Sequence, residues 1–385
     1  METLTTRTLD AADRTPAQIY AALRAKTPWR TSYLIEASEP DARGEQRSWI
    51  GFLVKSEAAY SPTSDGVRDL ASVAVELAST PASEALPHGG ATDVAVLLMR
   101  DAILPKHGVA PRPEQPFVGR QLSDIASIAF DHAAKTITLS SANANTVERL
   151  ALAIAAAPPL PDLPPPGGPR PEHVTEHPAA AVFSKQLAKA ERRLTSGGVD
   201  RLVLARELVA PPRGADMFEV YRALQIAAPA PYHVFVELAA APMFSAYTVA
   251  AAAREAARLS GTVGAEAFAE QVFGLLGGVE SICGAPEKEA LAAWRDLTTF
   301  PFGMRGGLFL RARPGGAVDV LRATSYVALE DAQLTTMGFA DVVPGRGVDA
   351  HTEAACADAS EALAAIRHAH DIAASRPAEA PAPGA

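Results

Sequence analysis

The chain has 385 residues, of which 48% are hydrophobic and 21% charged, a balance typical of a folded globular protein and too apolar for wholesale disorder. Its 35 basic and 44 acidic residues leave a formal charge of −9 with no basic stripe, which argues against nucleic-acid binding through phosphate neutralisation. The two cysteines, Cys283 and Cys356, exclude a disulfide framework and a cysteine-based structural zinc site.

No stretch of the sequence fits a signal peptide or a membrane span. The first 18 residues lack the apolar core of a secretory signal. The longest apolar run, residues 227–253, is interrupted by Pro229, Pro231 and Pro242, which is incompatible with a transmembrane helix. We therefore expect a cytoplasmic protein that does not bind a membrane.

The first half of the chain reads mainly as a sheet. A polar N-terminal segment, residues 1–30, holds one helical pattern at residues 16–25. Short runs rich in β-branched residues follow within residues 31–157, and Pro, Gly, Asp or Asn bound them. They predict strands at residues 31–38, 47–56, 93–104 and 125–141, the last with a hairpin turn at 131–135. A helix is predicted at residues 145–156, capped by Asn145 or Thr146.

A proline-rich stretch, residues 158–178, separates this half from the next. Proline cannot donate a backbone hydrogen bond and keeps the chain extended, so we expect a semi-rigid linker and a domain boundary here. At the other end, residues 371–385 are rich in Pro and Ala and are predicted to form a disordered tail.

The second half, residues 179–370, mixes amphipathic helical patterns with β-branched runs. Helices are predicted at residues 180–195, 217–226, 249–259, 265–276, 287–297 and 351–370. Strands are predicted at residues 201–208, 232–238, 306–316 and 318–329. This mixture, with strands that look antiparallel, predicts an α+β fold.

Several short motifs occur in a characteristic order in this half. They are GVDRLVLAR at 198–206, YRALQIAAPAPY at 221–232, ESICGAPEKEAL at 280–291, MRGGLFL at 304–310 and VLRATS at 320–325. The ordered series resembles the chorismate-utilising family: anthranilate synthase component I, aminodeoxychorismate synthase and isochorismate or salicylate synthase. The resemblance covers most of residues 31–367 and is strongest between 181 and 326. It implies a layered fold like that of anthranilate synthase component I, with large, mainly antiparallel sheets flanked by helices.

The resemblance also implies a reaction that depends on Mg²⁺, a general acid and, for attack by water, a general base. Where the family has its basic lysine, this chain has Arg201, which does not lose its proton at working pH. Thr248 stands for the acidic glutamate and Thr298 for a metal-binding glutamate. On the segment that matches the family's last metal-binding helix, Glu353 is the nearest carboxylate, and Asp358 stands at the position of the family's lysine. The core also looks shortened after Thr248. We therefore predict no magnesium site and no other cofactor.

Several residues that match the family's substrate-binding positions are retained. Arg322 matches the arginine that pairs a chorismate carboxylate, and Ser281 keeps the hydroxyl of the family's threonine. A turn formed by Gly345, Arg346 and Gly347 replaces a turn whose amides hold a carboxylate. Together with Arg201, these residues are the candidate substrate-binding set.

Each candidate has a structural alternative. Arg322 could form an ion pair within the protein, Ser281 could cap a helix, and residues 345–347 could be an ordinary turn. Arg206 is interpreted as an arginine that secures the core. The histidines near the C-terminus are predicted to lie on a solvated helix end rather than at a metal; they are His351, His368 and His370.

Two classes of function remain open. The first is an enzyme of aromatic or specialised-metabolite biosynthesis that acts on a chorismate-like carboxylated ring without Mg²⁺, with Glu353, Glu280 or Tyr232 moving protons. The second is a non-catalytic pseudoenzyme, either a ligand sensor or a subunit that partners an amidotransferase or an active synthase. An ordinary Mg²⁺-dependent isochorismate or anthranilate synthase fits these residues least well.

Overall fold

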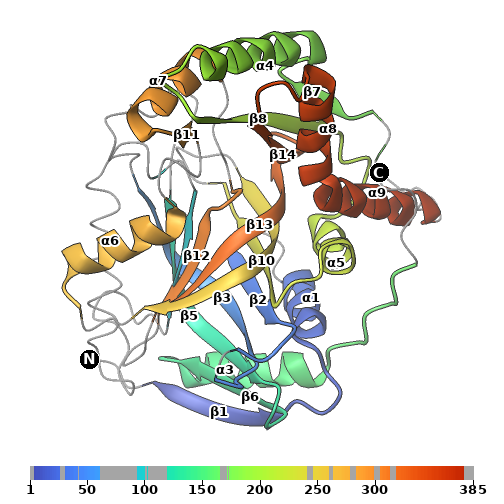
Figure 1. The fold of residues 1–385 in the computed structure, drawn as a ribbon. Coiled ribbons are helices and arrows are strands. Elements are labelled where there is room, and N and C mark those ends of the chain that lie inside the picture. The colour runs from blue at the N-terminus through green and yellow to red at the C-terminus, as the bar shows by residue number, and fades with distance from the viewer. Residues whose placement is uncertain are drawn as a thin grey trace.

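The computed structural model describes residues 4–26, 31–41, 43–60, 93–99, 102, 119–164, 171, 173–240, 246–259, 263–277, 283–298, 304–312 and 318–376. Within these ranges, fourteen strands form one antiparallel sheet, and helices cover its outer faces (Figure 1). This is the α+β architecture, with a large antiparallel sheet flanked by helices, that the sequence predicts.

The strands are β1 (Thr5–Asp10), β2 (Ser32–Ala37), β3 (Arg47–Tyr60), β4 (Val94–Leu98), β5 (Gly119–Asp131), β6 (Thr136–Ser141), β7 (Thr175–His177), β8 (Arg201–Ala210), β9 (Tyr232–Leu238), β10 (Tyr247–Leu259), β11 (Gly284–Ala285), β12 (Leu308–Ala312), β13 (Val318–Glu330) and β14 (Gln333–Val342). The helices are α1 (Pro16–Lys26), α3 (Ala144–Ala155), α4 (Ala180–Thr195), α5 (Met217–Ala227), α6 (Ala265–Leu276), α7 (Glu287–Leu297), α8 (Val348–Asp358) and α9 (Ser360–Ser375).

Part of the sheet closes on itself through strand β4. This strand pairs with β5 on one side and β12 on the other, which completes the circuit β5–β3–β2–β9–β10–β13–β12–β4. Alternate side chains of all these strands, among them Tyr33, Trp49 and Phe309, form one buried apolar cluster. A buried ion pair of 2.7 Å between Arg311 and Asp93 adds polar contacts, and the Arg311 guanidinium lies 4.7 Å from the centre of the Trp49 ring. Side chains therefore fill the inside of the circuit.

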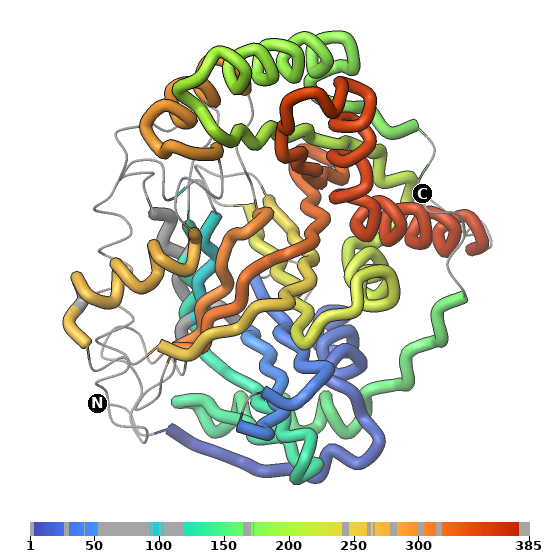
Figure 2. The backbone as a smooth tube through the Cα atoms, in the orientation of Figure 1, coloured from blue at the N-terminus to red at the C-terminus, as the bar shows by residue number. Residues whose placement is uncertain are grey.

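Two helical layers cover the outside of the sheet (Figure 2). Helices α4, α6 and α7 share one apolar cluster with β8, β12 and β13. Helices α1, α3, α5 and α9 share a second cluster with strands from both halves of the chain. Strand β2, before the proline-rich stretch, pairs with β9, after it. Residues 158–178 therefore connect two parts of one sheet, and the domain limits proposed from the sequence stay a prediction.

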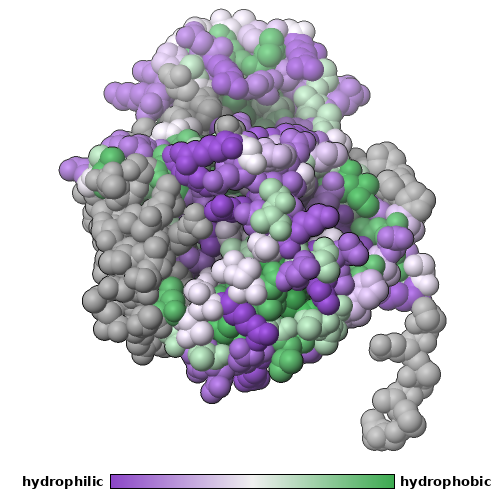
Figure 3. Space-filling view, turned by 90° about the horizontal axis from the view of Figure 1, so that it is seen from below, coloured by the Kyte–Doolittle hydropathy of each residue, from purple (hydrophilic) through white to green (hydrophobic). Residues whose placement is uncertain are grey.

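Hydrophilic residues are interspersed with small hydrophobic patches on the face shown in Figure 3. In the part of the chain that the structure describes, no helix is long and apolar enough to cross a membrane.

Most predicted elements are confirmed. The helices at 180–195, 265–276 and 287–297 and the strand at 232–238 match α4, α6, α7 and β9 to the residue. The turn at 131–135 joins β5 to β6, and the Asp131 carboxylate accepts the Ala134 amide at 2.9 Å. The predicted cap of α3 is wrong, because Asn143 caps this helix: its side-chain Oδ1 accepts the Asn145 amide at 2.9 Å.

The helix predicted at residues 249–259 is wrong, because this segment is strand β10. Its alanines have high helix propensity, but propensity is a weak prior that tertiary contacts override. Strand β10 pairs with β9 on one side and with β13 on the other. Residues 249–253 are buried between these neighbours. Pairing with a strand on each edge therefore outweighs the helix propensity of this segment.

The prediction of a solvated helix end for the C-terminal histidines is also wrong. His351, His368 and His370 are 0%, 1% and 7% exposed. The single predicted helix is two helices, α8 and α9, separated at Ala359, and these histidines lie on their packed faces. Nε2 of His370 forms a hydrogen bond with the Pro211 carbonyl at 2.9 Å, so the imidazole connects α9 to the segment that follows β8.

The close approach of β14 to α8 gives a stability prediction. A methyl group at Gly338 would lie 1.8 Å from the backbone oxygen of Ala355. We expect Gly338→Ala to lower the free energy of unfolding by about 1–3 kcal/mol, the usual cost of overpacking. Gly274→Ala, inside α6 with nothing within 4 Å, is the control and should be neutral or stabilising by up to about 1 kcal/mol. Equal effects in urea denaturation would contradict this packing.

A second prediction concerns pH. Burial lowers the pKa of His370, so the folded protein takes up a proton there less readily than the unfolded chain. Stability should therefore fall as the pH drops below the ordinary histidine pKa of about 6.5. We expect His370→Gln, which can still donate to Pro211, to lose less stability than the wild type between about pH 7.5 and about pH 5.5. If the urea midpoints of the two proteins change equally with pH, this histidine does not contribute to the pH dependence of stability.

Candidate functional site

The predicted substrate-binding residues lie on strands that diverge from a common hairpin. Strands β13 and β14 pair only over residues 328–330 and 333–335. Beyond the hairpin, β13 joins β10 and β12, whereas β14 joins β8. Arg322 is on the first branch, and Arg201 and the turn at 345–347 are on the second. The structure brings Arg201 and this turn to one end of the sheet and leaves Arg322 on the other branch.

Arg322 forms an ion pair with a carboxylate of the neighbouring strand. Its Nη1 donates to Oε2 of Glu255 at 2.9 Å, and the two side chains are 27% and 62% exposed. The two residues face each other across the β10–β13 ladder, directly after a register shift between Ala253 and Glu255. The structural alternative for Arg322, an ion pair within the protein, is confirmed. Its role toward a ligand remains a prediction.

Arg201 also has a carboxylate partner. Its Nε and Nη2 donate to Oδ1 of Asp341 at 2.9 and 2.6 Å, and both side chains are about half exposed. Strand β11 pairs with the start of β8 and sets Ala285 opposite Arg201. The motif that contains Gly284 and Ala285 therefore reaches the beginning of β8. Glu280 and Ser281, which precede it, lie outside the described residues.

The turn formed by Gly345, Arg346 and Gly347 is exposed and leads into α8. Both glycines have positive φ, 79° and 86°, a backbone conformation that favours glycine. The Gly347 amide donates to Oε1 of Glu191 at 3.3 Å, and Glu191 belongs to α4. A protein carboxylate thus occupies the place where the resemblance expects a ligand carboxylate.

In the described part of the chain, the positions that the resemblance assigns to the family's metal ligands do not form an oxygen-rich set. Glu353 is exposed on α8, and Thr298 is buried at the end of α7. Asp358 is paired with Arg305 and accepts the Phe339 amide at 3.0 Å. Over the ranges given above, three or more His, Cys, Asp or Glu side chains nowhere converge as metal ligands. These residues do not fit Mg²⁺, and we derive no step through it.

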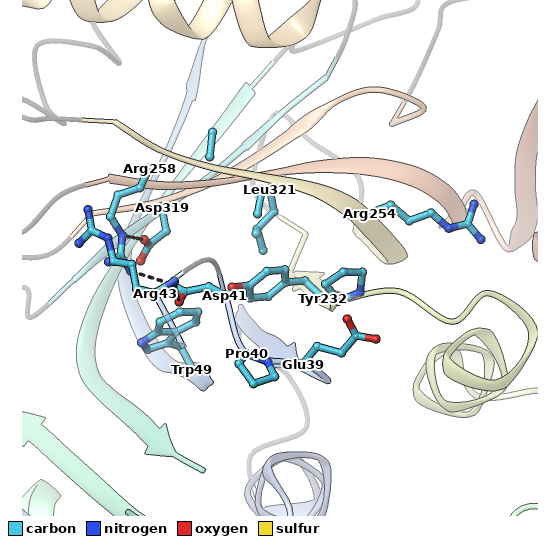
Figure 4. Close-up of a pocket in the computed structure, with 13 residues that line it drawn as sticks. Glu39, Pro40, Asp41, Arg43, Trp49, Tyr232, Arg254, Arg258, Asp319 and Leu321 are labelled. Atoms are coloured by element: carbon cyan, nitrogen blue, oxygen red, sulfur yellow. Dashed lines mark hydrogen bonds and ion pairs between the residues drawn. The ribbon is translucent and has the colours of Figure 1, made fainter. Parts of the chain in front are cut away.

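Tyr232 lines a cavity of about 300 Å³ at one end of the closed circuit (Figure 4). Trp49 and Leu321 contribute apolar walls. Arg258 and Asp319 also line the cavity, and Nε of Arg258 donates to Oδ1 of Asp319 at 2.6 Å. Residues from the β2–β3 loop complete the rim: Glu39, Pro40, Asp41 and Arg43. Sequence reasoning identified Tyr232 but missed Arg258 and Asp319, because strands far apart in the sequence bring them together.

The surroundings of Tyr232 define what its hydroxyl can do. Burial and the nearby carboxylates of Asp41 and Asp319 raise the pKa of Tyr232. The phenol therefore stays protonated at neutral pH. It can donate a hydrogen bond into the cavity, and it does not act as a base there.

Arg206, on the same strand as Arg201, has a purely structural environment. Its side chain is 1% exposed, is ion-paired with Glu176 and lies 5.1 Å from the centre of the Phe183 ring. The interpretation of Arg206 as an arginine that secures the core is confirmed.

The two arginines of β8 give a matched prediction. Arg206→Gln should lower the free energy of unfolding by about 2–4 kcal/mol, because it breaks a largely buried pair in which Glu176 keeps 22% exposure. Arg201→Gln should change it by less than about 1 kcal/mol, since its ion pair with Asp341 is exposed. Urea denaturation of both variants checks this, and similar losses would contradict the assigned environments.

Comparisons with known proteins agree with this architecture. Residues 66–246 match the model of the chorismate binding enzyme family. No curated protein matches the chain by sequence.

Three solved structures share the fold. Anthranilate synthase component I from Streptococcus pneumoniae TIGR4 is 14% identical with a TM-score of 0.63, over 82% of this chain and 92% of that chain. MenF, the menaquinone-specific isochorismate synthase from Escherichia coli, is 10% identical with a TM-score of 0.60, over 96% and 95%. DhbC from Bacillus anthracis, described as a putative 2,3-dihydroxybenzoate-specific isochorismate synthase, is 12% identical with a TM-score of 0.57, over 90% and 99%. The family-model match over residues 66–246 and the shared fold both make this chain similar to the chorismate-utilising enzymes.

Proposed function

We propose that the protein binds a chorismate-like carboxylated ring and serves aromatic or specialised-metabolite biosynthesis in the cytoplasm. The observation that carries the proposal is the half-buried Arg322 guanidinium on β13, in a chain similar to these enzymes. Its partner Glu255 is 62% exposed, so the carboxylate can move into water when a ligand carboxylate arrives. A planar guanidinium suits that exchange because it binds a carboxylate through two parallel hydrogen bonds.

A second anionic group of the ligand has candidate partners on the other branch. Arg201, Arg346 and the amides of the turn at 345–347 supply positive charge and N–H donors at one end of the sheet. Ser281 is proposed to add a hydroxyl donor. A ring that carries two carboxylates would be held from both branches.

The chemistry proposed for the bound ring does not use Mg²⁺. Glu353 and Glu280 are the candidate proton-transfer groups, and Tyr232 is a candidate hydrogen-bond donor because it lines the cavity with a protonated phenol. The second candidate function is a non-catalytic subunit that partners an amidotransferase or an active synthase. The Arg201–Asp341 pair favours this alternative, because a guanidinium neutralised by a carboxylate stands where the family has a base.

Binding can be measured by calorimetric titration of chorismate into the protein without added metal. We expect binding that Arg322→Ala weakens at least about tenfold, the loss typical of one charge-assisted contact. The control is Arg7→Ala, which removes an exposed, ion-paired arginine from β1 and should leave the affinity unchanged. Equal affinity of the wild type and Arg322→Ala would overturn the assignment of Arg322.

Turnover separates the candidate functions. With chorismate and Mg²⁺, we expect neither isochorismate nor, with added ammonia, anthranilate, because Arg201 and Thr248 cannot supply the family's base and acid. Chromatographic detection of either product would establish an ordinary synthase. Loss of chorismate without Mg²⁺ would establish the metal-independent enzyme, and binding without turnover the non-catalytic subunit.

A further inference from the structure

The partner of Arg322 comes from an irregular position in strand β10. Along the β10–β13 ladder, Ala253 pairs with Ala323 and Glu255 pairs with Arg322, so Arg254 is an extra residue without a partner in the register. Between Ala252 and Ala253 the ladder likewise passes over Thr324 on β13, so each strand has one residue without a partner in the register. The two irregularities cancel, and Glu255 faces Arg322 in the same register as the rest of the ladder.

The unpaired residue of β10, Arg254, has an ion pair of its own. Arg254 pairs with Glu361 at the start of α9, and Glu361 also accepts the hydroxyl of Ser325 on β13. The consecutive residues Arg254 and Glu255 therefore have different partners. Arg254 ties the strand to α9, while Glu255 extends to Arg322 and stays 62% exposed.

The other described anion-binding candidates show the same arrangement. Asp341 accepts two N–H groups of Arg201, and Glu191 accepts the Gly347 amide. In each case a carboxylate of the protein fills the place assigned to a carboxylate of the ligand. Glu255 is the most exposed of these three carboxylates, at 62% against 54% for Asp341 and 23% for Glu191. It is therefore the one that water stabilises best after displacement.

We infer that Glu255 is a built-in competitor: it holds Arg322 in the empty site and is displaced by the carboxylate of the incoming ring. The inference rests on the proposed function, because it names the residue that sets the affinity of the same site. Glu255 orients and neutralises Arg322 without contacting the ligand, so it is a positioning residue. Exposed ion pairs are weak, so Glu255 should reduce ligand affinity without preventing binding.

Glu255→Gln tests this directly, because it keeps the shape of the side chain and removes its charge. Calorimetric titration of chorismate should show about two- to five-fold tighter binding than in the wild type, the range that one exposed ion pair allows. The matched control is Glu148→Gln. Glu148 has the same 62% exposure and is ion-paired with Arg7 far from Arg322, so removal of the same charge there should leave the affinity unchanged.

A double-mutant cycle separates competition from a general charge effect. In the Arg322→Ala background, Glu255→Gln should no longer change chorismate affinity, because its effect acts through Arg322. Thermal unfolding of each variant verifies that it is folded.

The outcomes distinguish the two proposals. If chorismate binds the wild type and Glu255→Gln binds it no more tightly, the competitor role is wrong and the proposed function stands. Equal tightening in Glu148→Gln would reduce the effect to net charge and would also overturn the role. If neither the wild type nor Glu255→Gln binds chorismate, the proposed function fails, and the inference fails with it.

Discussion

Strand β13 carries the constraint on which the rest of the architecture depends, because it pairs with three different strands. It follows β10 along its length, meets β12 over residues 319–322 and touches β14 only at the hairpin over residues 328–330. A strand can use each edge only once at a given residue, so β14 has to leave β13 and pair with β8. One branch then closes the apolar circuit, and the other reaches the layer of α4 and α8. The candidate site is the consequence of this divergence.

Burial decides what each arginine of this sheet can do. Arg206 and Arg311 are 1% and 3% exposed, and their carboxylate partners cannot be exchanged without leaving a charge in the core. Arg201 and Arg322 are partly exposed, and water can receive their partners when another anion competes. The same chemical pair is therefore structural in the first case and suited to exchange in the second. This difference, rather than residue type, separates scaffold from site.

Local signals were sufficient for much of the fold and for little of the site. Amphipathic spacing located α4 and α7 to the residue, because both bury one regular stripe. It failed for β10, whose alanines favour a helix until the ladders with β9 and β13 form. Arg322 was found through its motif, but its partner Glu255 depends on the pairing register of β10 with β13, which no periodicity shows. The burial of His368 likewise depends on tertiary packing of α9.

The central claim is that the Arg322–Glu255 pair opens to receive a ligand carboxylate. A crystal structure of the protein with chorismate bound tests it most directly, since it shows both partners of Arg322 at once. We expect a ring carboxylate within hydrogen-bond distance of the Arg322 guanidinium and the Glu255 carboxylate turned into solvent. A bound ring with the 2.9 Å contact between Arg322 and Glu255 still intact would contradict it.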